Sequence, residues 1–184
     1  MAIGDETFDS VLMAAKAGAE WAWSTIFRDL WGPVAGYLAN RGAPEAEDAA
    51  SEVFIKVARN IHSFDGDENS FRSWVFVITH RTLIDDRRYR SRRPTTAEMP
   101  EHFSDPGGNA EDEAVNQLVT AELVEAFEQL TVDQRDVLAL RMISGLTLEQ
   151  TAEVLGKQTG AVKALQHRAL ASLQKQLESA GVSQ

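Results

Sequence analysis

Cysteine is absent from the 184 residues of this chain, and so are long apolar runs. Without thiols, we expect no disulfide, no thiolate metal site and no thiol chemistry. No segment reaches the roughly 18 consecutive apolar residues that a membrane-spanning helix needs. The N-terminus lacks the basic and apolar segments of a signal peptide. We therefore expect a cytoplasmic protein with no membrane segment of its own.

Strand patterns are also missing, because apolar and polar residues do not alternate over any stretch of useful length. Apolar residues instead recur at helical spacing, and the hydrophobic fraction of 43% is enough for one or two small cores. We predict an all-α fold of two small helical domains, residues 8–93 and 113–179. A flexible acidic linker, residues 94–112, joins them, since it holds prolines and glycines without periodicity.

Positive charge is scarce overall, and the net charge of −10 at first argues against nucleic-acid binding. The distribution of the charged residues along the chain changes that interpretation. Arg72 to Arg93 holds seven arginines and two aspartates, and Gly156 to Leu177 holds four bases and no acid. Between them, Pro94 to Glu128 holds nine acids and no Lys or Arg. This segregation indicates two basic surfaces and an acidic connector.

The stretch from Leu146 to Leu177 has the spacing of a helix-turn-helix. Ala152 is small enough for a second helix to approach, Gly156 can adopt the positive φ of the turn, and Val162 points to the core. The outward face of the second helix carries side chains suited to phosphates and base edges: Lys163, Gln166, His167 and Arg168. A plain helical hairpin with a solvated face is the alternative.

Helical periodicity predicts the remaining elements. We expect helices at 8–16, 19–40, 44–61, 71–93, 113–129 and 132–143. Thr131 is the predicted N-cap of the last, with Gln134 completing a capping box. In the second helix, Pro33 is a candidate kink. The predicted apolar stripe of that helix is Trp21, Ile26, Phe27, Leu30, Val34 and Leu38.

Two further charged features stand out in the first half. Asp48, Ser51 and Glu52 share one exposed face of the helix that follows Pro44, and on the residues alone a solvated helix face is the favoured explanation. The helix at 71–93 ends with five arginines in seven residues, more than a helix dipole needs, which favours nucleic acid. These are Arg87, Arg88, Arg90, Arg92 and Arg93.

Three segments, in this order, resemble the ECF (extracytoplasmic-function) sigma factors, promoter-recognising subunits of bacterial RNA polymerase. They are AEDAASEVFIKVARNI, FRSWVFVITHRTLIDDRR and LTVDQRDVLALRMISGLTLEQTAEVLGKQTGAVKALQHRALASL. The resemblance covers nearly all of the chain. It implies a non-enzymatic initiation factor, without cofactor or metal, whose partners are core RNA polymerase (β′ and β subunits) and promoter DNA. An anti-sigma factor is a further candidate partner.

The resemblance also implies roles for particular residues. The strip of Asp48, Ser51 and Glu52 would dock on a coiled coil of β′. The −10 promoter element would be bound and opened by residues 63–93, with Phe64, Arg72, Arg81, Arg87, Arg88 and Arg90 as candidates. The −35 element would be contacted by the recognition helix through Thr159, Lys163, Gln166, His167 and Arg168. The acidic linker resembles the segment that threads toward the polymerase active-site channel.

Two positions depart from the family pattern. Arg81 stands where the family often has Asn, at a position tied to the −10 base pocket. Gln158 stands where the family often has Ser or Thr at the N-cap of the recognition helix. Because Gln caps poorly, we expect Thr159 to cap that helix and the helix to begin one residue later.

Two alternatives remain open on sequence grounds. A helix-turn-helix regulator could bind duplex DNA as a dimer without polymerase, although it would not need the basic helix and acidic strip of the first half. An all-α hydrolase could use His62, His80 or Glu52. The sequence shows no metal-ligand pair of histidines, no glycine-rich phosphate loop and no nucleophile motif to support it.

Overall fold

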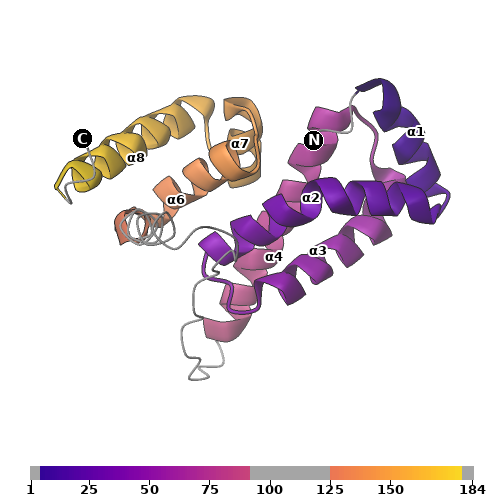
Figure 1. The fold of residues 1–184 in the computed structure, drawn as a ribbon, viewed down its shortest axis with the longest axis horizontal. Coiled ribbons are helices and arrows are strands. Elements are labelled where there is room, and N and C mark those ends of the chain that lie inside the picture. The colour runs from indigo at the N-terminus through magenta and orange to yellow at the C-terminus, as the bar shows by residue number, and fades with distance from the viewer. Residues whose placement is uncertain (1–4, 92–124, 180–184) are drawn as a thin grey trace, which may run out of the picture.

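The computed structural model describes residues 5–91 and 125–179, and within these ranges every regular element is a helix. Figure 1 shows two groups of helices side by side, with the C-terminal end of α8 pointing away from the first group. The first group is α1 (Asp5–Lys16), α2 (Glu20–Asn40), α3 (Ala46–Asn60), η1 (Ile61–Ser63) and α4 (Glu68–Ser91). In the second, residues 125–128 are helical and precede α6 (Val132–Leu138), η2 (Ala139–Ile143), α7 (Leu148–Leu155) and α8 (Thr159–Ser179). The all-α prediction is confirmed.

Helix α2 forms the centre of the first group, and its buried face differs from the predicted stripe. Trp21 and Phe27 are 57% and 43% exposed, whereas Tyr37 is fully buried. The buried residues are Ala22, Ile26, Leu30, Val34, Tyr37 and Leu38. Trp21 lies about 100° around the helix from Ala22, so only one of the two can face the core. Pro33 lies inside α2 without dividing it.

The loop before α4 is held by a basic side chain and an aromatic cluster. Lys16 Nζ of α1 donates a hydrogen bond to the Phe64 carbonyl at 2.6 Å. The Phe64 ring packs against those of Phe71 and Trp74, with centroids 5.1 and 5.2 Å away. Helix α4 begins earlier than predicted, because Asp67 Oδ1 accepts the Ser70 backbone N–H at 2.7 Å and caps the helix.

Local capping signals explain the second group. The predicted capping box of Thr131 and Gln134 is present, and a second one, not predicted, joins Thr147 and Gln150 at the start of α7. Gly156 ends α7 with φ 62°, as the helix-turn-helix pattern predicted. The Gln158 carbonyl accepts the first bonds of α8, so Gln158 occupies the N-cap and the prediction that Thr159 caps was wrong.

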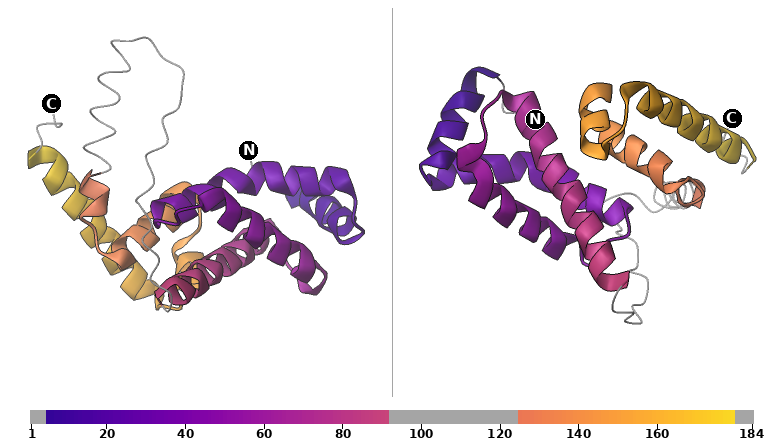
Figure 2. Two further views of the ribbon diagram at one scale, coloured as in Figure 1. Left: turned by 90° about the horizontal axis from the view of Figure 1, so that it is seen from below. Right: turned by 180° about the vertical axis from the view of Figure 1, so that it is seen from behind.

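The two groups pack directly against each other, which the sequence did not predict. Helix α7 lies against α4 and η2 against α2, and the two groups remain adjacent in the views of Figure 2. The first group's hydrophobic core takes in Ala139, Leu140, Leu146 and Val154 from the second. The predicted linker at 94–112 and most of the predicted helix at 113–129 lie outside the described residues. None of the described helices has the length and apolar character needed to cross a membrane.

Candidate nucleic-acid interface

The exposed face of α8 carries the predicted DNA-contacting side chains. Val162 is fully buried against Ala152 of α7, and this contact fixes how α8 is turned. Thr159, Lys163, His167 and Arg168 are exposed, and Gln166 is half-buried. Because α8 is seated on its buried Val162 and Ala169 face, these polar side chains point into solvent, where a DNA groove could reach them.

Lys163 and Arg168 occupy different sides of α8. They are five residues apart, which is about 140° around the helix, whereas His167 lies four residues from Lys163 and shares its face. Arg168 Nε donates to the Ala164 carbonyl at 3.2 Å, so its guanidinium is held along the helix. The structure thus separates a Lys163–His167 face from the Arg168 side.

The arginines of α4 divide into structural and outward-facing ones. Arg72 Nη2 lies 2.5 Å from Asp29 Oδ2, and both side chains are largely buried, so Arg72 ties α4 to α2. Arg87 donates to the Arg41 carbonyl. Arg81, Arg87 and Arg88 are exposed, Arg87 in spite of its bond to Arg41. The side chains of Arg90, Arg92 and Arg93 lie outside the described residues.

Phe64, a candidate platform for an extruded base, is only 7% exposed. Its ring faces Phe71 and Trp74, and Phe71 also lies 5.5 Å from Phe8, so the ring belongs to an aromatic core cluster. Stacking on a base would require Phe64 to leave this cluster. Of its two ring partners, Trp74 is the one that is only half-buried.

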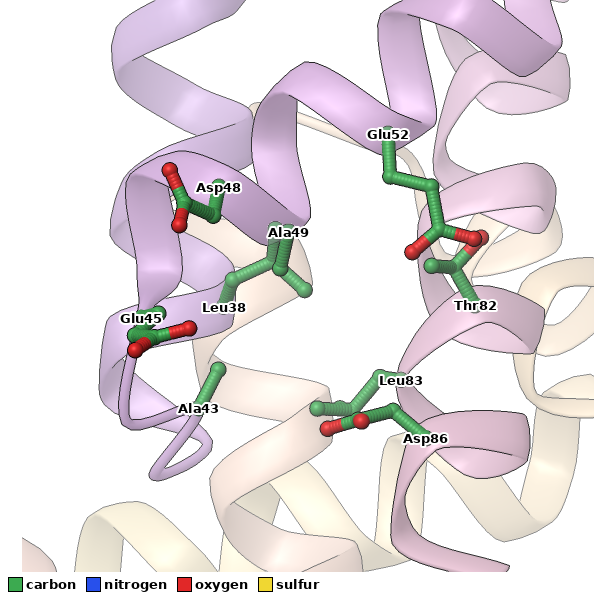
Figure 3. A pocket seen from close by; sticks show the side chains of 9 residues that line it. All are labelled: Leu38, Ala43, Glu45, Asp48, Ala49, Glu52, Thr82, Leu83 and Asp86. Carbon is green, nitrogen blue, oxygen red and sulfur yellow. The ribbon is translucent and has the colours of Figure 1, made fainter. Parts of the chain in front are cut away.

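The acidic strip of Asp48, Ser51 and Glu52 is exposed on α3. Figure 3 shows Asp48 and Glu52 at the rim of a pocket between α3 and α4. Glu52 Oε1 pairs with Lys56 Nζ at 2.8 Å, and Ser51 Oγ donates to the Glu47 carbonyl at 3.0 Å. Apolar side chains form the pocket's floor and further carboxylates its rim: Leu38, Ala43, Ala49 and Leu83, with Glu45 and Asp86.

Ile55 is a functional candidate that the sequence analysis missed. Its side chain is 51% exposed. It follows Ser51 by four residues and Glu52 by three, so it lies on the same face of α3, one turn beyond the acidic strip. An apolar side chain at a position predicted to face solvent was the available signal. The acidic strip is therefore followed by an exposed apolar side chain at its C-terminal end.

A buried polar cluster, here named the Asp136 cluster, joins the two groups of helices and consists of Tyr37, Arg41, His80 and Asp136. The Tyr37 hydroxyl donates to Asp136 Oδ1 at 3.0 Å and lies 2.7 Å from His80 Nδ1. Arg41 Nε pairs with Asp136 Oδ1, and their side chains are 3% and 4% exposed. Since the single hydroxyl proton of Tyr37 goes to Asp136, His80 Nδ1 must donate to the Tyr37 oxygen.

Burial dominates the ionisation of this cluster. It raises the pKa of Tyr37, and it also raises the pKa of Asp136, an effect that Arg41 opposes. Burial, together with the positive charges of Arg41, Arg87 and Lys157, lowers the pKa of His80 to about 4. His80 is therefore neutral at pH 7. Among the described residues, no group of acidic side chains and histidines could hold a metal ion.

Sequence comparisons match both halves of the chain to known families. Residues 28–93 match the family described as Sigma-70 region 2, and residues 126–175 match Sigma-70, region 4. The chain is 33% identical over 168 residues to the ECF RNA polymerase sigma factor BldN of Streptomyces coelicolor, covering 89% of this chain and 63% of BldN. It is 30% identical over 189 residues to the ECF RNA polymerase sigma factor SigD of Mycobacterium tuberculosis, covering 98% of this chain and 89% of SigD.

Solved structures share the fold. CnrH, in complex with the cytosolic domain of CnrY, matches with a TM-score of 0.66 at 21% identity over 92% of this chain and 96% of that chain. The sigma factor RpoE of Bartonella quintana, in complex with the anti-sigma factor NepR, matches with a TM-score of 0.66 at 22% identity. That match covers 84% of this chain and 95% of RpoE.

Proposed function

Because the chain belongs to the ECF RNA polymerase sigma factors, subunits that direct core RNA polymerase to start transcription at promoters, we propose how its helices divide this work. The first group of helices, residues 8–93, binds polymerase and opens the −10 element. The second group, residues 113–179, recognises the −35 element. Residues 94–112 connect them. Sigma factors are initiation factors rather than enzymes, and this proposal gives the chain no catalytic site.

One observation carries the proposal: the chain presents an exposed acidic strip on α3 and an exposed basic face on a capped helix-turn-helix. A regulator acting on duplex DNA alone has use for the second surface but none for the first. A polymerase subunit uses both, one to hold the enzyme and one to hold the promoter.

We assign polymerase docking to the acidic strip, with Ile55 as an apolar contact at its C-terminal end. The exposed carboxylates of Asp48 and Glu52 would attract a basic partner surface. Apolar contact at Ile55 would exclude water from the interface beside the carboxylates. The expected partner is the coiled coil of the polymerase β′ subunit.

The test is a charge reversal at the docking strip. Asp48→Lys combined with Glu52→Lys should abolish capture of core polymerase while helicity is retained, because both side chains point into solvent. Glu20→Lys combined with Glu149→Lys, at exposed first-turn positions of α2 and α7, is a control with the same change in net charge. Unchanged capture by the Asp48/Glu52 variant would remove the strip from the mechanism.

Promoter opening is assigned to the outer side of α4. Arg81 and Arg88 are exposed there and would hold the DNA backbone, with Arg90 as a further candidate. Arg72 serves mainly to position α4, because it is largely buried and paired with Asp29, whereas the exposed Arg87 stays a candidate for the DNA backbone. Phe64 would take part only after leaving its aromatic cluster.

Recognition of the −35 element is assigned to Lys163 and His167 for base edges and to Arg168 for the backbone, with Thr159 and Gln166 beside them. Run-off transcription with core polymerase on a library of upstream sequences tests the whole proposal. Initiation from a subset of sequences that share two motifs is the expected result. No initiation with any sequence, despite polymerase binding, would contradict it. An anti-sigma factor is a further proposed partner, since RpoE and NepR form such a complex.

A further inference from the structure

We propose that α1 is a positioning element for promoter recognition. Lys16 at its end holds the loop of residues 64–67, here named the Phe64 loop, in the conformation that takes a base of the −10 element. Helix α1 precedes residues 28–93, the part of the chain that matches Sigma-70 region 2, so that match gives it no role. The inference rests on the proposed function of residues 63–93 at the −10 element, and it gives α1 a share in choosing the sequence.

Helix α1 is fixed firmly enough to hold a loop in place. Four of its residues, at the spacing of one helix face, are buried: Phe8, Val11, Leu12 and Ala15. Trp23 Nε1 of α2 donates to the Ala15 carbonyl at 3.1 Å, so the last turn of α1, which carries Lys16, is tied to α2. Figures 1 and 2 show α1 at the end of the first group that lies away from the second group.

Lys16 supplies the partner of a backbone carbonyl in the Phe64 loop. Phe64 is only 7% exposed, and its N–H donates to the Ile61 carbonyl at 3.1 Å. Its own carbonyl accepts from Lys16 Nζ at 2.6 Å. A backbone carbonyl that is removed from water needs a partner, and an ammonium makes a stronger bond than a neutral donor. Without Lys16 the Phe64 carbonyl would turn toward water, and the loop would move with it.

The loop is packed so closely that such a movement would be felt throughout it. The Phe64 ring lies 5.1 Å from that of Phe71, which in turn lies 5.5 Å from that of Phe8. A Cβ at Gly66 would lie 3.1 Å from Phe64 Cζ and 3.1 Å from Ser70 Cβ, so the loop backbone rests on the edge of the ring. Helix α1 therefore contacts one packed unit twice, through the Phe8 ring and through the ammonium at its end.

The positive charge of Lys16 offers a rival explanation. Residues 62–70 hold three acids and no Lys or Arg: Asp65, Asp67 and Glu68. Lys16 is thus a basic side chain that the fold brings to an acidic loop, and its charge would favour DNA of any sequence. A positioning role has a different consequence, because a displaced loop distinguishes one base from another less well. The test must therefore measure sequence discrimination as well as affinity.

The test is Lys16→Met, which removes the ammonium and keeps a side chain of similar length. Core polymerase carrying each variant is bound to single-stranded −10 oligonucleotides, namely the sequence preferred in the run-off library and its single-base variants. The ratio of affinities for preferred and mismatched sequences should fall at least about threefold, the effect of losing one hydrogen bond that orders the loop. Lys16→Arg keeps a charged donor and should restore the ratio.

Lys157→Met is the matched control. It removes the same charge and a hydrogen bond from Lys157 Nζ to Asp133 Oδ2, 2.9 Å long, in the second group. It should leave the ratio unchanged, and every variant should capture core polymerase as the unchanged protein does.

The outcomes separate this inference from the proposed function. An unaltered ratio in Lys16→Met would overturn the inference. An equal loss of affinity for every sequence would also overturn it, because Lys16 would then act by charge alone. Absence of any −10 preference in the unchanged protein would count against the proposed function instead.

Gly66→Ala tests whether Lys16 acts through the loop. The added methyl group must push aside the Phe64 ring or Ser70, so it displaces the same backbone from another side. It should also lower the ratio. In the double variant the combined change should differ at least about twofold from the product of the two separate changes, because both substitutions act on one packed unit. A combined change equal to that product would show independent effects and would overturn the positioning role of Lys16.

Discussion

At the scale of single residues, Lys163 and Arg168 test whether α8 reads bases or only grips DNA. Lys163→Ala should cost about 1–3 kcal/mol on the preferred −35 sequence and much less on mismatched ones. Arg168→Ala should lower affinity for all sequences about equally, because a backbone contact carries no sequence information. The measurement is binding of both variants to a panel of −35 sequences.

Lys175→Ala is the control for this comparison, since it removes the same charge from an exposed position farther along α8. It should leave the order of preferred sequences unchanged. An Arg168 variant that changes sequence preference, beside a Lys163 variant that does not, would reverse the assignment of the two residues.

Residue-level prediction from sequence succeeded where the signal was local. Gly156 and Thr131 were identified because a positive φ and a capping box depend on neighbours within a few residues. Phe64 was placed in a DNA-binding loop, yet it packs in an aromatic cluster. An aromatic side chain in a loop has no local pattern that separates a core position from an exposed one.

At the scale of elements, α7 depends on its capping box. Thr147→Ala removes the acceptor of the Gln150 N–H, which lies 3.2 Å from Thr147 Oγ1. Loss of such a cap costs about 0.5–2 kcal/mol, or roughly 2–4 °C in Tm for each 1 kcal/mol in a protein of this size. Thermal unfolding followed by circular dichroism measures it.

Thr25→Ala is the matched control for the capping variant. Thr25 lies within α2, and its hydroxyl donates to the Trp21 carbonyl at 2.9 Å, a bond that adds little to helix stability. We expect its Tm to stay close to that of the unchanged protein. Equal loss of stability in both variants would mean that the cap contributes nothing specific to α7.

The contact between α4 and the second group should weaken in acid because of His80. Its pKa is about 4 when the contact is closed, and its ordinary value is 6.5. Because the pKa of His80 is lower in the contact than outside it, a proton on His80 favours separation of the two groups. The contact is therefore strongest above pH 6.5 and weakens as the pH falls from 6.5 toward 4. At pH 5.5 the open population should rise by up to about tenfold, seen as a larger radius of gyration in small-angle X-ray scattering.

The other ionisable groups of the contact limit this effect. Arg41, Arg87 and Lys157 oppose a proton on His80, whereas Asp136, whose pKa burial raises, favours the closed form as it takes up a proton in stronger acid. The acid response should therefore be clearest above about pH 5. His80→Gln should abolish it, and His62→Gln, at an exposed position, should not. A response that survives His80→Gln would belong to another group.

At the scale of the whole molecule, charge is segregated, so a protein with a net charge of −10 can still bind DNA. Arg81→Ala with Arg88→Ala should flatten the log–log dependence of promoter binding on salt. The slope should change by up to about 0.7–0.9 units for each phosphate that the protein no longer neutralises. Open-complex formation, followed by permanganate footprinting, should fall with it.

Arg28→Ala with Arg59→Ala removes equal charge from exposed positions on α2 and α3 and should change the slope little. If these variants flatten the slope as much as the Arg81/Arg88 pair, net charge alone controls binding. If neither double variant changes the slope, the basic end of α4 is only a solvated helix end.

The helices of the two groups were largely predicted from the sequence, but the arrangement of the two groups relative to each other could not be predicted from it. Tyr37 and Asp136 are 99 residues apart in the chain, and although Asp136 lies in a segment that resembles the family, nothing in that segment marks it as buried. A buried aspartate within an amphipathic helix has the same local pattern as an exposed one. Only the folded structure shows that its partners are Tyr37 and Arg41 of the other group.

The Asp136 cluster also limits how freely the two groups can be exchanged between related proteins. In a chimera, Arg41 and Tyr37 from one parent would meet whatever side chain the other parent supplies in place of Asp136. An apolar side chain there would leave a buried guanidinium without its counter-charge. Recombination, whether in the laboratory or between genomes, would then have to transfer these positions together or produce a factor in which the buried Arg41 is unpaired.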